Sequence, residues 1–141
     1  MGVEVSSTTV IKIERAYEPA EHRDGYRVLI DRLWPRGILK GELKLDEWAK
    51  DLAPSPDLRK LFGHDPEKWR EFSAKYRIEL RAIAAREKIK DLARRARRSN
   101  LTLGYGAKDE DHNDAVILRD ILVRALGKSA PKGRRSSKKA A

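Results

Sequence analysis

Two short apolar segments separated by a long helical region constrain the fold of this chain more than any other feature. Residues 26–34 contain the run Val-Leu-Ile at positions 28–30, which is typical of a strand buried on both faces. Residues 101–107 form another strand-like segment. The roughly 60 residues between them are ample for a right-handed helical crossover, which takes a dozen or more. The sequence therefore predicts two parallel strands of an α/β fold, with their carboxyl ends at one edge of the sheet.

An earlier segment, residues 9–17, also has strand character. Ile11 and Ile13 alternate with charged residues there, as in a strand with one buried face. The connection from this segment to residues 26–34 is about eight residues long, which is short for a parallel crossover and favours an antiparallel pair. Spacing alone leaves the sense of this pair open. Residues 1–8 show no periodicity, and we expect them to be loose.

Helix signals fill the region between the two main strands. Residues 45–52 predict a short helix. Ser55 is a good N-cap for a helix that begins at the following proline and ends at Gly63. Asp65, again followed by proline, opens a longer helix, and residues 89–98 form either a second helix or a bent continuation of it. An inward-facing stripe at spacings of three and four is predicted for the longer helix: Trp69, Phe72, Tyr76, Leu80 and Ile83.

The net charge of +10 is unevenly distributed along the 141 residues. Residues 127–141 hold six basic residues and no acidic one, which leaves 26 basic and 22 acidic residues, a net charge of +4, for residues 1–126. The final segment is rich in Gly, Ser, Pro and Lys, so we predict a disordered basic tail after a single α/β domain over residues 1–126. Such a tail is either a solvated extension or a non-specific contact to nucleic acid.

Two features that the sequence lacks exclude several classes of protein. The chain has no cysteine, which excludes disulfides, thiolate zinc sites and cysteine nucleophiles. It also has no apolar run near 18 residues and no charged-then-apolar leader, so we expect no membrane contact and a cytoplasmic location.

Reactive side chains are concentrated in residues 107–113, Ala-Lys-Asp-Glu-Asp-His-Asn, between the last strand and a helix predicted over residues 114–126. His112 and Asn113 stand just before that helix, where free amide protons and the helix dipole favour an anion. We predict that both are catalytic, with His112 as general acid or base because its ordinary pKa lies nearest neutrality.

Lys108 and Tyr105 complete this side of the predicted site: the lysine would hold the anion, and the tyrosine would stack on the ligand or form a wall. The competing interpretation is that Asn113 or Asp114 only caps the helix, while the acidic residues 109–111 would repel a phosphate.

A calcium loop is the other interpretation of these acids. Asp109, Asp111 and Asn113 fit its first, third and fifth positions, but Asp114 stands at the sixth position in place of glycine and Asp120 at the twelfth in place of glutamate. We therefore predict no metal and no cofactor.

Residues 31–37, Asp-Arg-Leu-Trp-Pro-Arg-Gly, end the strand over residues 26–34 with a turn, because the proline has no amide proton to donate and the glycine accepts positive φ. Arg32 and Arg36 can bind phosphate or carboxylate, and Trp34 can stack on a base. These three residues are predicted to bind ligand. The alternative is that Arg32 pairs with a neighbouring acid while Trp34 fills the core.

Three segments of the chain resemble the YeaO-like branch of a large bacterial family of unknown function: residues 25–37, 46–72 and 101–122. The resemblance covers nearly all of residues 9–126 and excludes the tail. It implies a small α/β domain with a mainly parallel sheet, which favours a parallel first pair despite its short connection. With the three strand segments above, we predict a small, mainly parallel three-stranded sheet flanked by helices, with Rossmann-like layering. The resemblance implies no reaction, and the cysteines that other branches carry in the matching loop are absent here.

Together these patterns predict a pocket between the 31–37 turn and the 107–113 loop for a small anionic ligand, phosphate-bearing or nucleotide-like. Acid–base hydrolysis or transfer is the reaction class expected if the protein is an enzyme. The alternative is a nucleic-acid-associated protein in which the arginines at 94–98 and the basic tail contact phosphates.

Overall fold

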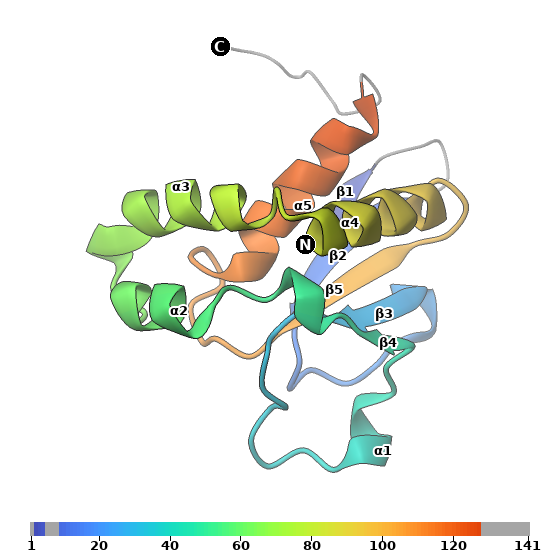
Figure 1. Ribbon diagram of the computed structural model, residues 1–141. Helices are drawn as coiled ribbons and strands as arrows, with labels where there is room; N and C mark the ends of the chain where they lie inside the picture. The colour runs from blue at the N-terminus through green and yellow to red at the C-terminus, as the bar shows by residue number, and fades with distance from the viewer. Residues whose placement is uncertain (1, 5–8, 128–141) are drawn as a thin grey trace.

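The computed structural model describes residues 2–4 and 9–127. Apart from Gly127, the tail predicted over residues 127–141 lies outside the described residues. Within them the chain forms one mixed sheet and a set of helices (Figure 1).

The sheet has five strands in the order β1-β2-β5-β3-β4. Their bounds are Gly2–Glu4 (β1), Val10–Arg15 (β2), Tyr26–Leu29 (β3), Glu47–Trp48 (β4) and Leu101–Tyr105 (β5). The β1–β2 pair is antiparallel, and the β2–β5, β5–β3 and β3–β4 pairs are parallel. The parallel sense of β3 and β5 is therefore confirmed, whereas the predicted count of three strands is wrong. Strands β2 and β3 are not neighbours; each pairs with β5 between them.

The two additional strands, β1 and β4, are short, and no pattern in the sequence predicted them. Strand β1 lies in the segment that showed no periodicity and pairs with β2 at the sheet edge. Strand β4 lies where residues 45–52 predicted a helix, which is wrong: two residues pair with β3, and only Lys50–Leu52 form a 3₁₀ turn. Pairing with an existing strand overrides a weak local helix preference here.

The helices are Lys40–Leu43 (α1), Pro56–Phe62 (α2), Trp69–Glu79 (α3), Ile83–Ala96 (α4) and Asp114–Ala125 (α5), with 3₁₀ turns at His22–Asp24, Lys50–Leu52 and Pro66–Lys68. Ser55 caps α2, and Gly63 ends it with positive φ, as predicted. Residues 83–96 form a second helix rather than a bent continuation of α3. The predicted inward stripe ends at Leu80, because the chain turns before α4 and leaves Ile83 77% exposed.

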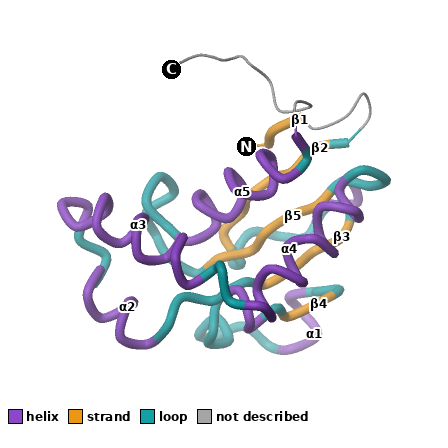
Figure 2. The backbone as a smooth tube through the Cα atoms, turned by 45° about the horizontal axis from the view of Figure 1, so that its top comes forward, coloured by secondary structure: helices purple, strands orange, loops and turns teal. Residues whose placement is uncertain are grey.

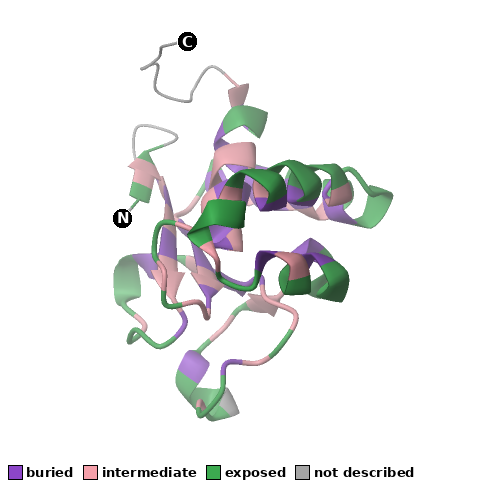
Figure 3. Ribbon diagram, turned by 90° about the vertical axis from the view of Figure 1, so that its left-hand side faces the viewer, coloured by how far each residue is buried: buried purple, intermediate pink, exposed green. Residues whose placement is uncertain are grey.

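Helices α3, α4 and α5 lie on one face of the sheet, and α1 lies on the other (Figures 1 and 2). The main core forms between the sheet and the long helices, where Val28, Leu103, Tyr76 and Leu118 are buried. Buried residues line the inner sides of the elements, and exposed residues cover their outer sides (Figure 3). The opposite face has only a small cluster around Leu29. Rossmann-like layering, with long helices on both faces, is therefore not confirmed.

A charged network occupies the sheet face beside that small cluster. The Asp24 carboxylate, which is fully buried, accepts hydrogen bonds from Lys12 and from the Arg27 guanidinium. It also accepts one from the Glu21 backbone amide at 2.9 Å. Glu14 contacts both cations, at 3.2 Å from Arg27 and 3.7 Å from Lys12. Four charged side chains from β2, β3 and the turn between them are thereby held together.

Asn100 joins the starts of three elements. Its side-chain oxygen accepts from the Val10 backbone amide, its side-chain nitrogen donates to the Arg23 carbonyl, and its backbone carbonyl accepts from the Tyr26 amide, each at 2.9 Å. Gly25 passes directly beside this carbonyl with a φ of +67°. The chain approaches so closely here that only glycine fits.

Candidate functional site

The carboxyl ends of β3 and β5 place the two predicted walls of the site next to each other. The 31–37 turn follows β3, and the 107–113 loop follows its neighbour β5. The Asp31 carboxylate accepts a hydrogen bond from the Gly106 backbone amide at 2.8 Å, which ties the start of the turn to the chain just before the loop. The prediction that both segments emerge at one sheet edge is confirmed, and this edge is where parallel α/β sheets bind ligands.

The three ligand-binding candidates of the turn have different environments. Trp34 donates its indole N–H to the Ile38 carbonyl at 2.6 Å and packs edge-on against Trp48, so it supports the fold. Arg36 is exposed, with no ion-pair partner among residues 2–4 and 9–127. Arg32 is half-buried, and its Nε atom is enclosed without a hydrogen-bond partner in the same residues. The expected alternative, an ion pair from Arg32 to a neighbouring acid, is not formed among these described residues.

Asn113 is the N-cap of α5. Its side-chain oxygen accepts from the Val116 amide at 3.2 Å, and its side-chain nitrogen donates to the Asp109 carbonyl at 2.9 Å. Asn113 is 2% exposed, so its amide group is committed to the helix start rather than available to a substrate.

His112 is held from two sides. Its Nδ1 atom lies 3.0 Å from the Asp109 carboxylate, and its ring packs edge-on against Trp69 with centroids 5.2 Å apart. The backbone amides of Asp111 and His112 also donate to this carboxylate. Hydrogen bonds from the Asp111 amide and then from the His112 ring hold the pKa of Asp109 below its ordinary value. The His112 side chain keeps about one third of its surface exposed.

The remaining two candidates lie at different depths. Tyr105 is 2% exposed and belongs to the main core, and burial raises the pKa of its hydroxyl. Its ring therefore forms the floor of the sheet edge rather than an open stacking surface. Lys108 is exposed and forms no ion pair within the described part of the chain.

A carboxyl pair beside this edge was not singled out by the sequence. Asp31 follows β3, Asp114 begins α5, and the two carboxyl groups lie near enough to interact. Burial, and then the neighbouring Asp31 carboxylate, hold the pKa of Asp114 well above its ordinary value. The positions of the two acids in the sequence could have indicated this pair, because one follows the end of a strand and the other begins a helix at the same edge of the sheet.

Replacing Asp114 with Asn is expected to flatten the pH dependence of stability above about pH 5. The folded state holds the Asp114 proton more tightly than the unfolded state does. The free energy of unfolding therefore falls by about 1.4 kcal/mol for each pH unit between the unfolded pKa and the raised folded pKa. Asn has nearly the same size and is neutral, so the variant removes the ionisable group and little else. Urea denaturation of both proteins from pH 5 to 9 measures the difference.

The comparison with the variant isolates the ionisation of Asp114. The carboxyls with lowered pKa, Asp24, Glu47 and Asp109, are ionised in both folded and unfolded states above about pH 5, and other groups that ionise in this window are common to both proteins. Parallel stability profiles for wild type and Asp114→Asn would show that Asp114 ionises like an exposed aspartate.

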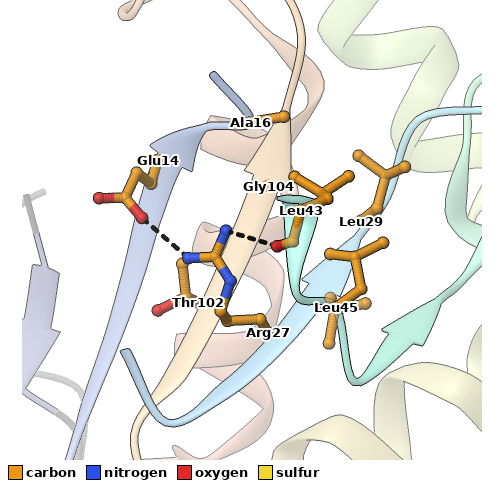
Figure 4. A pocket seen from close by; sticks show the side chains of 9 residues that line it. Glu14, Ala16, Arg27, Leu29, Leu43, Leu45, Thr102 and Gly104 are labelled. Atoms are coloured by element: carbon orange, nitrogen blue, oxygen red, sulfur yellow. Dashed lines mark hydrogen bonds and ion pairs between the residues drawn. The ribbon is translucent and has the colours of Figure 1, made fainter. Parts of the chain in front are cut away.

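Two pockets lie away from the predicted site. The smaller, of about 10 Å³, has room for one water at most (Figure 4). It lies beside the Arg27 guanidinium, which contacts Glu14 and the Leu43 carbonyl at 3.2 Å each, so it is a packing gap in the α1 face. The larger is a groove of about 360 Å³ on the helical face, between α3, α4 and α5.

Two further features are absent from residues 2–4 and 9–127. No group of three or more histidines and carboxylates is placed there to hold a metal ion. No helix in these residues has the length and apolar character needed to cross a bilayer.

Comparisons with known proteins identify relatives over most of the chain. The family described as the inactive DUF488-N3 subclade matches residues 10–140. The uncharacterized protein YeaO of Escherichia coli K12 is 46% identical over 112 residues, which cover 79% of this chain and 96% of that protein. The uncharacterized proteins Mb3100c of Mycobacterium bovis and Rv3073c of Mycobacterium tuberculosis are each 41% identical over 114 residues, covering 81% of this chain and 94% of each relative. No solved structure matches the chain.

Proposed function

The chain belongs to the inactive DUF488-N3 subclade as a YeaO-like member, and from this premise and the geometry of its sheet edge we propose that it binds a small anionic ligand. The ligand lies between the 31–37 turn and the 107–113 loop and carries a phosphate or a similar oxyanion. The word "inactive" in the description of the family favours binding over catalysis.

Arg32 carries this proposal. Its Nε atom is enclosed without a hydrogen-bond partner, as are those of Arg27 and Arg95 in the described residues. The guanidinium of Arg27 bonds to Asp24 and that of Arg95 lies over the Tyr26 ring. Arg32 forms no such contact within residues 2–4 and 9–127, so its guanidinium can donate to an anion. Arg32 stands directly after β3, at the edge where such ligands bind. Arg36 and Lys108 add positive charge from the two sides, and neither is neutralised by an ion pair in the described residues.

The acids around the loop oppose an anion less than their number suggests. Asp114 retains its proton to higher pH than an ordinary aspartate, so the Asp31–Asp114 pair carries less negative charge than two carboxylates. Asp109 is satisfied by two backbone amides and the His112 ring. Within the described part of the loop, only Glu110 and Asp111 project into solvent without such contacts.

His112 is the residue through which a catalytic role would act. Asp109 orients its Nδ1 atom, which is the arrangement that fixes the tautomer of a general acid or base. We assign this ring a contact with the ligand, and Asn113 supports it as the helix cap. Acid–base hydrolysis or transfer remains the reaction class to test if turnover is found.

Addition of inorganic phosphate or AMP is expected to raise the melting temperature of the wild-type protein and of a protein lacking residues 127–141. Saturation at 100 times Kd adds about 2.7 kcal/mol to the free energy of unfolding. Arg32→Ala is expected to lose this increase, because the guanidinium group proposed to bind the anion is removed. Thermal-shift titration, confirmed by isothermal calorimetry, is the measurement.

Arg59→Ala, which removes an exposed arginine on α2, is the matched control and should respond like wild type. The proposal fails if Arg32→Ala is stabilised as much as wild type is, or if neither ligand stabilises the wild-type protein. A response that disappears with residues 127–141 would instead assign anion binding to the tail.

Nucleic-acid association is the second candidate, and it has less support. Within the arginine cluster, Arg95 stacks over the Tyr26 ring at 3.8 Å and Arg94 faces Asp91 at 3.8 Å, so both have structural partners. Only Arg97 and Arg98 are exposed without a described partner. The tail deletion above tests this candidate with a single-stranded oligonucleotide as the probe.

A further inference from the structure

The groove on the helical face combines an aliphatic floor with a cationic rim. Leu80 and Ile89 are buried and Ile121 is half-buried, which places these three side chains at the bottom. Four exposed cations surround them: Arg77, Arg81, Arg86 and Lys90. The residues that line it come from the end of α3, the first half of α4 and α5, three helices that are labelled in Figure 1.

The positive charge of the rim is only partly neutralised. Arg77 is paired with Asp120 at 3.0 Å, and Lys90 faces Glu87 at 3.9 Å. Arg81 and Arg86 have no ion-pair partner within residues 2–4 and 9–127. Two uncompensated guanidinium groups on the same rim attract an anionic partner.

An exposed apolar side chain stands beside the groove. Ile83 does not line the groove, but it lies one turn before Arg86 on the same side of α4 and is 77% exposed. It therefore adds apolar surface next to the cationic rim. Apolar surface within a charged rim is typical of a protein-docking site.

The chemistry of the groove selects among anionic partners. Its lining has no aromatic ring on which a nucleotide base could stack, and single-stranded nucleic acids rely on such rings. A concave volume of about 360 Å³ accepts inserted side chains, whereas a flat bilayer surface does not enter it. Carboxylates for the rim and aliphatic side chains for the floor occur together in acidic amphipathic peptide segments.

We propose that the groove between α3, α4 and α5 is a docking site for an acidic amphipathic segment of a partner protein, which inserts leucine-like side chains between Leu80, Ile89 and Ile121 and pairs its carboxylates with Arg81 and Arg86. This surface is separate from the sheet edge that holds Arg32. The two sites can therefore be tested independently.

Fluorescence anisotropy with a labelled glutamate-rich peptide that carries leucines one helical turn apart tests the docking site in the full-length protein. Arg81→Glu/Arg86→Glu is expected to weaken binding about tenfold or more, since both rim charges become repulsive. Ile83→Ser is expected to weaken the binding of this leucine-containing peptide. It should leave unchanged the weaker binding of a second peptide in which serines replace the leucines. Circular dichroism and melting temperature establish that each variant is folded.

Arg97→Glu/Arg98→Glu is the matched control, because it changes the net charge equally at exposed positions outside the groove. It is expected to change affinity by less than about twofold at physiological salt. Equal weakening by the two double variants, or no binding by wild type, would overturn the proposal. The proposal is also overturned if Arg81→Glu/Arg86→Glu weakens the binding of an oligonucleotide of equal charge more than it weakens the binding of the peptide. It is likewise overturned if the wild-type protein is a dimer and the same variant dissociates it.

Discussion

Replacing Asp24 with Ala is expected to lower the free energy of unfolding by about 3 kcal/mol, because it leaves the buried Arg27 and the half-buried Lys12 without their main partner. The Asp24 side chain has no exposed surface, and it accepts from Lys12, from Arg27 and from the Glu21 amide. Burial alone would raise its pKa, but hydrogen bonds from Lys12 and the Glu21 amide bring the pKa of Asp24 below its ordinary value.

The effect is placed at the lower end of the range for broken buried ion pairs. Glu14 still contacts both cations in the variant, and Lys12 keeps some exposure to water. Urea denaturation at pH 7 measures the loss. Asp51→Ala, at an exposed acid, is the control and should change stability by less than about 0.5 kcal/mol. A loss below about 1 kcal/mol for Asp24→Ala would mean that the network is not stabilising.

The lowered pKa of Asp24 also sets a pH dependence. The folded state releases this proton more readily than the unfolded state, so its contribution is complete above about pH 4 and is lost as pH falls through the folded pKa. Asp24→Ala should therefore approach wild type in stability under strong acid.

Gly25→Ala is expected to destabilise the protein by about 3 kcal/mol or more. A β-carbon at this position would lie 2.1 Å from the Asn100 carbonyl oxygen, and the φ of +67° adds strain for any residue with a side chain. The Asn100 backbone must move to relieve the clash, which disturbs its hydrogen bonds to Val10, Arg23 and Tyr26.

The shift in urea midpoint measures this loss, and Gly41→Ala is the matched control. No atom lies within 4 Å of the β-carbon that would be added at Gly41, which is in α1 and lacks positive φ. That control should be neutral or stabilising, because alanine favours a helix over glycine by up to about 1 kcal/mol. Similar midpoints for both variants would show that the chain at Gly25 moves away from Asn100 easily.

Elements with strong local signals were predictable from the sequence. Ser55 caps α2 where expected, because its side chain satisfies an amide group that the next few residues leave open. Asn113 caps α5 in the same way, which was the competing interpretation to its predicted catalytic role. The parallel pairing of β3 with β5 followed from the length of the helical connection alone. These features depend on short-range chemistry or on simple chain geometry.

Features that depend on the assembled fold were not predictable. The two residues of β4 form a strand because they pair with β3. The three residues of β1 form a strand because they pair with β2. The spacing of apolar residues placed Ile83 in the same inward stripe as Leu80, but tertiary packing introduces a turn after Leu80 that ends the stripe. The Asp31–Asp114 pair joins residues far apart in the chain, whose interaction only the sheet topology defines.

The adjacency of the two segments was predicted more accurately than the environments of their side chains. The turn and the loop meet at the predicted edge, but Trp34, Tyr105 and Asn113 are engaged in packing or capping. A residue type indicates what a side chain can do, and only its neighbours show whether it is already bonded. Arg32, Arg36, Lys108 and His112 keep exposed or unbonded groups, and their contact with a ligand stays a prediction.

The central position of β5 has a consequence for how the protein is made. β5 lies in the middle of the sheet but begins at residue 101, so ribosomal synthesis delivers the strand that joins β2 to β3 after most of the chain has emerged. Until then each of these strands presents a bare parallel edge. A stalled or truncated nascent chain therefore exposes two unpaired edges, the feature that promotes aggregation before folding is complete.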